Sequence, residues 1–277
     1  MGDYTNFLMA KVKLAQSFGF EIELAEINPI LKPFQKECVR WAVRMGRAAL
    51  FESFGLGKSI QQLEIIRLIL TRAGGLGLIV IPLGVRQEFM RDAKMLGVPV
   101  KFIRRIEEVE DGIGIYLTNY ESVRDGKLDP RRFTVASLDE ASCLRGFGGT
   151  KTFREFMALF AGDRKTMNER VLGEAVPYRF VATATPSPND FIELLVYSAF
   201  LGVMDVGQAK TRFFRRNSEK ADELTIHPHK QKEFWLWVSS WSLFVQRPSD
   251  LGYSDEGYVL PEMEIHWHEI PADHSEA

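Results

Sequence analysis

Short apolar runs alternate along the chain with longer amphipathic stretches. The runs begin at residues 48, 78, 98, 114, 133 and 178, and their nearly unbroken apolar character is typical of strands buried on both faces of a parallel sheet. The longer stretches predict helices at 36–45, 60–70, 85–96, 151–159 and 191–200. Strands that alternate with helices indicate right-handed βαβ units. The pattern therefore predicts an α/β fold with a central, mostly parallel sheet flanked by helices.

Changes in this pattern divide the chain into three parts. Residues 1–30 contain one amphipathic segment, 4–18, which predicts a packing helix. Residues 31–205 form the α/β unit, in which we expect the polar stretch 162–174 to be an exposed helix or excursion. Residues 206–277 form a helical, aromatic-rich C-terminal extension.

The C-terminal extension combines basic, aromatic and alternating segments. The run KTRFFRR at 210–216 interleaves basic and aromatic residues, which suits contact with a nucleic-acid backbone or a brace between domains. Residues 234–241 predict an aromatic helix that belongs to the core or forms a docking surface. The alternation over 263–270 predicts a further strand.

The turn after the first predicted strand has the composition of a phosphate-binding loop. The residues that we expect to face phosphate are Gly55, Leu56, Gly57, Lys58 and Ser59. The glycines leave room for backbone N–H groups and the start of a helix to face one point, where an anion binds. We expect Lys58 to contact the outer phosphates of a nucleotide, and the Ser59 hydroxyl to be a magnesium ligand. Glu52 stands where the consensus motif has its first glycine, so the match is partial.

The predicted strand that begins at residue 133 ends in two adjacent carboxylates, Asp139 and Glu140. Open α/β sheets bind ligands at the carboxyl ends of their strands. Because successive strand residues face opposite ways, the two carboxylates have different tasks. We expect Asp139 to hold magnesium, and Glu140 to orient and deprotonate an attacking water. The alternative interpretation is that the two carboxylates are simply a solvated strand end. The phosphate-binding loop upstream favours the catalytic interpretation.

Gln35 is a candidate for base recognition. It follows Pro33 and Phe34 at the start of a predicted helix. Its amide carries a donor and an acceptor, which match the edge of adenine. A helix-start residue without a ligand is the alternative.

Thr183 and Thr185 are candidates for coupling. They end the predicted strand that begins at residue 178, and we expect them to hydrogen-bond toward Asp139 and Glu140. Such bonds would pass the state of the phosphate to the rest of the protein. A tight turn capped by Asp190 is the other interpretation, and both can hold together.

Composition limits the class of protein further. With 35 Lys+Arg against 37 Asp+Glu, the bulk charge neither requires nor excludes a nucleic-acid partner. Cys38 and Cys143 lie far apart without metal-ligand spacing, which indicates a reducing compartment. No apolar run approaches the ~18 residues of a membrane span, and no secretory signal begins the chain. We therefore expect a cytoplasmic protein without membrane contact.

Taken in order, these motifs resemble the first RecA-like lobe of superfamily-two helicases and translocases, the DEAD/DEAH-box-like enzymes. The residues that carry the resemblance are FQ at 34–35, GLGKS at 55–59, VIP at 80–82, TNYE at 118–121, DEAS at 139–142 and TATP at 183–186. The resemblance covers roughly residues 30–200 and is closest to phage and mobile-element helicases of the chromatin-remodeller type. An acidic residue at the position of Glu52 is usual in that group.

This family implies ATP hydrolysis with Mg²⁺, coupled to movement along nucleic acid, here double-stranded DNA. By motif, Phe34 and Gln35 would bind adenine, and Lys58 and Ser59 would hold phosphate and magnesium. Asp139 and Glu140 would perform the chemistry, assisted by Lys58. Ser142 departs from the histidine or aspartate of many members, which the remodeller-like groups tolerate.

The resemblance also implies partners. After residue 203 the sequence leaves no room for a second RecA-like lobe, which in such enzymes supplies an arginine finger worth ~10³–10⁵ in rate. We therefore expect a second lobe from the same or another chain. Some members accompany DNA methyltransferase modules, so such a module is a further expected partner.

Two other functions remain open. A non-catalytic helicase-like module would bind nucleic acid or a partner protein through the same fold. A P-loop kinase for a small molecule would carry an arginine-rich lid after the sheet, and the TATP segment and aromatic extension agree poorly with it.

Overall fold

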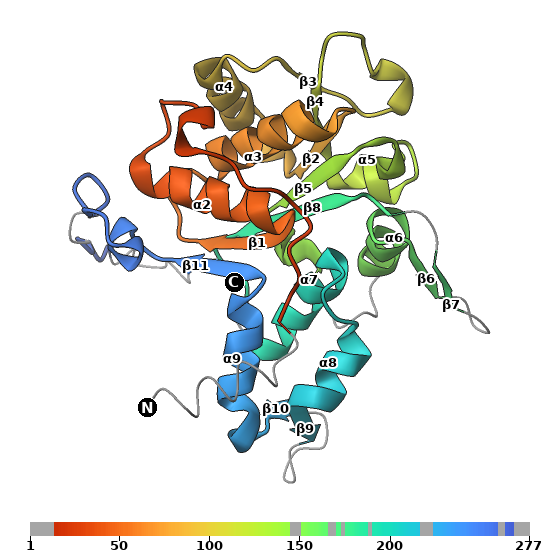
Figure 1. Ribbon diagram of the computed structural model, residues 1–277, viewed down its shortest axis with the longest axis vertical. Coiled ribbons are helices and arrows are strands. Elements are labelled where there is room, and N and C mark those ends of the chain that lie inside the picture. The colour runs from red at the N-terminus through yellow and green to blue at the C-terminus, as the bar shows by residue number, and fades with distance from the viewer. Residues whose placement is uncertain are drawn as a thin grey trace, which may run out of the picture.

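The computed structural model describes residues 14–144, 151–165, 170–172, 175–187, 190–216, 224–259 and 264–268 (Figure 1). Within these residues the main sheet has seven strands in the order β11-β1-β8-β5-β2-β4-β3, and all neighbouring pairs are parallel. The strands are β1 (Arg47–Glu52), β2 (Gly77–Ile81), β3 (Val100–Phe102), β4 (Ile115–Asn119), β5 (Val135–Asp139), β8 (Tyr178–Thr183) and β11 (Ser242–Val245). The predicted α/β fold with a mostly parallel sheet is confirmed.

Helices cover both faces of this sheet (Figure 1). They are α2 (Pro33–Met45), α3 (Lys58–Ala73), α4 (Arg86–Leu96), α5 (Tyr120–Arg124), α6 (Lys151–Phe160), α7 (Leu194–Leu201), α8 (Val206–Phe213) and α9 (Gln231–Ser239). In the described ranges, none of them is both long and apolar enough to cross a membrane.

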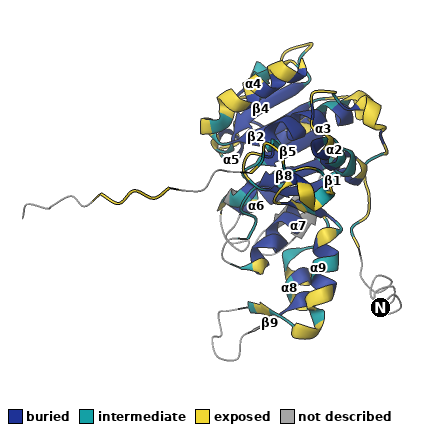
Figure 2. Cartoon of the chain, turned by 90° about the vertical axis from the view of Figure 1, so that its left-hand side faces the viewer, coloured by how far each residue is buried: buried dark blue, intermediate teal, exposed yellow. Residues whose placement is uncertain are grey.

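The two faces of the sheet pack into two separate apolar clusters. Because successive strand residues point to opposite faces, Leu50 and Ile79 pack with helices α2, α3 and α4. Their neighbours Phe51 and Val80 pack on the other face with α5 to α9. Figure 2 shows the buried residues concentrated in the strands and on the inner sides of the helices. This double burial explains why the strand sequences are continuously apolar.

Strand β11 brings the C-terminal part of the chain into the sheet. It lies parallel to β1, with Ala49 opposite Ser242 and Glu52 opposite Val245. The sheet thus continues past the domain boundary expected at residue 205, and that boundary itself stays a prediction. The arrangement also places the residues that follow β11 beside the loop that follows β1.

The aromatic helix α9 is part of the core. Trp237 and Phe234 are fully buried, and Trp237 stacks on Phe213 of α8 with ring centroids 5.0 Å apart. Arg212 joins the two helices through an ion pair to Glu233 of 2.7 Å. The aromatic residues of the basic segment 210–216 therefore pack inward, and Arg212 braces α8 against α9.

Two local predictions differ from the structure, and a third is met by one of its alternatives. An exposed helix or excursion was expected over 162–174, and the structure has an excursion in which β6 (Asp163–Lys165) pairs antiparallel with β7 (Arg170–Leu172). Residues 264–268 are not a strand, because no strand in the described part of the chain pairs with them and Trp267 is 88% exposed. Residues 14–18 are not helical, and the rest of the predicted helix 4–18 lies outside the described residues. A second small hairpin joins β9 (Phe214–Arg216) to β10 (Leu224–Ile226).

Candidate active site

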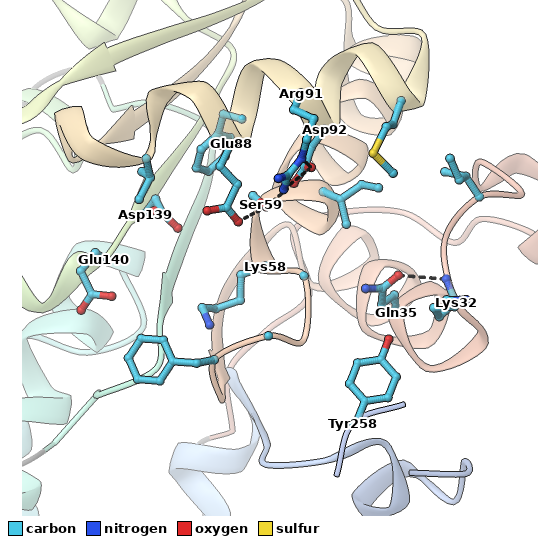
Figure 3. Close-up of a pocket in the computed structure, with 18 residues that line it drawn as sticks. Lys32, Gln35, Lys58, Ser59, Glu88, Arg91, Asp92, Asp139, Glu140 and Tyr258 are labelled. Atoms are coloured by element: carbon cyan, nitrogen blue, oxygen red, sulfur yellow. Dashed lines mark hydrogen bonds and ion pairs between the residues drawn. The ribbon is translucent and has the colours of Figure 1, made fainter. Parts of the chain in front are cut away.

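A pocket of about 540 Å³ lies at the carboxyl ends of β1 and β5 (Figure 3). This volume is within the range of small-molecule sites, ~300–1,000 Å³. The residues that the sequence predicts for the site and that line the pocket are Gln35, Gly55, Gly57, Lys58, Ser59, Asp139 and Glu140. Predicted residues from three distant parts of the chain therefore meet at one place.

The loop between β1 and α3 has the backbone that the glycines predict. Gly55 and Gly57 have φ angles of +82° and +81°, a conformation that side chains with a Cβ rarely adopt. A Cβ on Gly57 would also lie 2.5 Å from Nε2 of Gln35. Gly57 is the N-cap of α3, so the start of this helix and its free N–H groups face the pocket. The loop thus has the properties of an anion-binding site.

Lys58 supplies the positive charge at the centre of the pocket. Its Nζ donates to the carbonyl oxygens of Glu52 and Ser53, at 2.9 and 3.0 Å. Burial lowers the pKa of Lys58, whereas the nearby carboxylates, Glu52 first among them, oppose this decrease. A partly buried ammonium that donates hydrogen bonds to neutral carbonyl oxygens is well placed to gain a phosphate partner.

Ser59, the next residue, faces two carboxylates of α4. Its hydroxyl donates to Asp92 Oδ2 at 2.5 Å and lies 3.2 Å from Glu88 Oε1. Asp92 is buried and also pairs with Arg91 at 3.2 Å. Sequence analysis missed Glu88 and Asp92. Glu88 and Asp92 are four residues apart, so they lie on one face of the helix that follows β2. This spacing is the sequence signal that could have indicated them.

Asp139 is held by a buried relay of hydrogen bonds. Gln62 Nε2 donates to Asp139 Oδ1 at 2.8 Å, and Ser137 Oγ donates to Gln62 Oε1 at 2.6 Å. Burial raises the pKa of Asp139 to about 6, and the bond from Gln62 opposes this rise. Gln62, which the sequence analysis also missed, is a fully buried amide within an apolar helix and therefore requires such partners.

Glu140 has a backbone conformation that separates its side chain from that of Asp139. Its φ of +49° makes it the one non-glycine residue with positive φ among the described residues. Strained backbone of this kind costs ~1–3 kcal/mol and is concentrated at functional sites. Thr183 Oγ1 donates to Glu140 Oε1 at 2.9 Å, and Thr185 N donates to Thr183 Oγ1 at 3.1 Å. The expected contact between the TATP segment and Glu140 is thus present.

Gln35 lies at the opposite end of the pocket from Glu140 (Figure 3). Its Oε1 accepts from Lys32 N at 2.9 Å, and its Nε2 donates to Leu56 O at 2.8 Å. One amide N–H of Gln35 remains for a ligand. Phe34 and Leu56 do not line the pocket, because both are buried behind it in a small cluster with Cys38. These two residues support the loop and have no surface toward a ligand.

The pocket has oxygen groups suited to magnesium. Ser59 Oγ and the Asp139 carboxylate both line it, and hydroxyl and carboxylate oxygens are the ligands that this ion takes. The part of the chain that the structure describes contains no cluster of three or more metal-ligating acids, histidines or cysteines.

The parallel sheet, the glycine loop that leads into α3 and the carboxylate pair at the end of β5 together define a RecA-like α/β fold. Structural comparison agrees. The chain is similar to the SWI2/SNF2 ATPase core of Sulfolobus solfataricus solved with double-stranded DNA, with a TM-score of 0.62, 19% identity, and coverage of 81% of this chain and 46% of that chain.

Two further solved structures are also similar. The SWI2/SNF2 ATPase core domain of Sulfolobus solfataricus has a TM-score of 0.57 at 19% identity, covering 82% of this chain and 45% of that one. The UvsW helicase of bacteriophage T4 has a TM-score of 0.44 at 16% identity, covering 70% and 64%. No protein-family model matches the chain, and no curated protein matches it.

The chain therefore has the fold of the SWI2/SNF2 ATPase cores that it matches, as its motifs predict. It spans about half the length of the Sulfolobus chains that it matches.

Proposed function

We propose that this chain is the ATP-binding motor lobe of a DNA-directed superfamily-two helicase or translocase, which hydrolyses ATP with Mg²⁺ when a second lobe completes it. The observation that carries the proposal is that Lys58 and Ser59 share one pocket with Asp139 and Glu140. The topology of the sheet brings the two strand ends to one edge, and the side chains found there are a lysine, a hydroxyl and two carboxylates that line the same cavity.

The residues divide the chemistry between them. Lys58 and the N–H groups at the start of α3 bind the outer phosphates and stabilise the negative charge that develops there. Glu140 orients a water molecule and accepts its proton, while Thr183 holds the carboxylate in place. Asp139 and Ser59 would hold magnesium, which when bound neutralises charge on the phosphate oxygens.

The Ser59 hydroxyl, bound here to Asp92 and close to Glu88, would have to release the bond to Asp92 in order to hold a magnesium ion. The bond from Thr183 to Glu140 connects the TATP segment to the pocket, and we assign the proposed coupling to this bond.

Double-stranded DNA is the proposed track. Support comes from the fold shared with a SWI2/SNF2 core that was solved with duplex DNA. The match covers 46% of that core, and a second lobe as partner stays a prediction from sequence. A DNA methyltransferase module stays a prediction from sequence.

Substitution of Lys58 by alanine tests the phosphate site. We expect the affinity for Mg–ATP, measured by titration calorimetry, to fall roughly 10- to 100-fold, because hydrogen bonds to charged groups contribute ~1.5–3 kcal/mol. The control is Lys94→Ala, which removes an exposed lysine of α4. Equal affinity of wild type and Lys58→Ala would contradict the proposed site. Binding of ATP without turnover, even with duplex DNA and a second lobe, would favour the non-catalytic module.

A further inference from the structure

The pocket has two ends of different chemistry. Asp139, Glu140 and Lys58 form the charged end. Figure 3 places Lys32, Gln35 and Tyr258 at the other end, which combines a lysine, one amide and an aromatic ring. If phosphates bind at Lys58, the nucleoside must extend toward this second end. The inference below therefore rests on the proposed function.

Tyr258 is the aromatic ring available at that end. Of the other aromatic residues that line the pocket, Phe89 is fully buried, and Phe54 lies near Lys58, with Nζ 5.4 Å from its ring centroid. Figure 3 shows Tyr258 on the same side of the pocket as Gln35, away from Asp139 and Glu140. Tyr258 is only partly buried, so part of its ring faces the pocket.

The position of Tyr258 is fixed by its surroundings. Its ring meets that of Phe34 edge to face, with centroids 5.3 Å apart. The loop that carries it is closed by side chains: Asp250 accepts from the backbone N–H groups of Gln246 and Arg247, and Asp255 accepts from that of Ser249. Since β11 pairs with β1, this loop starts beside the phosphate-binding loop. These contacts hold the Tyr258 side chain in place at the edge of the pocket.

Tyr258 and Gln35 offer complementary interactions to a nucleobase. An aromatic ring stacks on the face of a base, whereas an amide reads its edge. Gln35 has a single N–H left after its bonds to Lys32 and Leu56, so it provides little binding by itself. The stacking surface therefore accounts for most of the base-dependent affinity.

We propose that Tyr258 forms the stacking wall of a nucleobase subsite, and that the chain segment after β11 thereby contributes a specificity-determining residue for ATP. The subsite takes a purine base stacked on the Tyr258 ring, with its polar edge toward Gln35.

Calorimetric titration with two ligands tests this proposal. Mg–ATP carries the base, whereas Mg–tripolyphosphate has the same phosphate chain without a nucleoside. We expect Tyr258→Ala to weaken ATP binding roughly 10-fold, the scale of base–aromatic stacking, and to leave tripolyphosphate binding unchanged. Tyr258→Phe keeps the ring and should bind ATP within about twofold of wild type.

Tyr253→Ala is the matched control. Tyr253 packs on the same cluster as Tyr258 but does not line the pocket, so its loss should leave ATP affinity unchanged. The proposal is overturned if Tyr258→Ala binds ATP as wild type does, or if it weakens both ligands equally, which would indicate a purely structural role. In both cases Lys58→Ala would still weaken the binding of both ligands, and the proposed function would stand. Failure of the wild-type chain to bind either ligand would overturn the function and the subsite together.

Discussion

Replacement of Glu140 by glutamine is expected to lower single-turnover ATP hydrolysis by about 10²–10⁴-fold, because glutamine cannot accept the proton of the attacking water. The amide oxygen can still accept the bond from Thr183, so the left-handed backbone and the pocket should persist. ATP affinity should therefore remain within about twofold of wild type. The measurement uses radiolabelled ATP with the protein in excess.

The control for this substitution is Glu107→Gln, which makes the same chemical change at an exposed position remote from the pocket. Its rate should equal that of wild type. A Glu140→Gln protein that hydrolyses ATP at the wild-type rate would remove Glu140 from the reaction. Loss of ATP binding in the same protein would show that the substitution damages the pocket.

Glu52→Gln is expected to remove a decrease of roughly 3 kcal/mol in the free energy of unfolding that the wild-type protein shows between pH 4 and pH 8. Glu52 is fully buried beneath the phosphate-binding loop, where it accepts from Gln61 Nε2 at 2.8 Å. Burial raises the pKa of Glu52 from 4.5 to about 7. The folded protein thus holds this proton more tightly than the unfolded chain. Its contribution to stability is full below pH ~4.5 and is lost as the pH rises to about 7.

Urea unfolding of both proteins at several pH values measures this effect. The free energy of unfolding of Glu52→Gln, minus that of wild type, should increase by roughly 3 kcal/mol between pH 4 and pH 8, about 1.4 kcal/mol per pKa unit. Asp139, whose pKa is also raised, is present in both proteins and cancels. Glu107→Gln should show no such trend. A difference that is constant across this pH range would mean that Glu52 has the same pKa in the folded and the unfolded state.

The meeting of the loop and the carboxylates could be predicted because it depends on local patterns and one topological rule. The runs at 48–51 and 133–138 are apolar enough to be central strands, and parallel central strands bring their carboxyl ends to one edge. Lys58 and Glu140 therefore had to lie near each other once both strands were assigned. The aromatic helix around Trp237 could be assigned to the core or to a docking surface, and burial decides for the core.

The remaining features depend on contacts between distant residues. Alternation over 263–270 predicts a strand only if a partner strand exists, and residues 264–268 have none. The short strand Ser242–Val245 has no strong pattern of its own, and its pairing with β1 decides its structure. Tyr258 enters the pocket because of that pairing, so no local signal pointed to it. Gln62 was visible only as a polar residue in an apolar helix.

The decisive measurement is single-turnover ATP hydrolysis by this chain, with and without duplex DNA. We expect slow hydrolysis that exceeds the Glu140→Gln level, increases with duplex DNA, and increases much further when a second RecA-like lobe is supplied. Hydrolysis indistinguishable from that of Glu140→Gln under all three conditions would mean that this helicase-like fold has no motor activity.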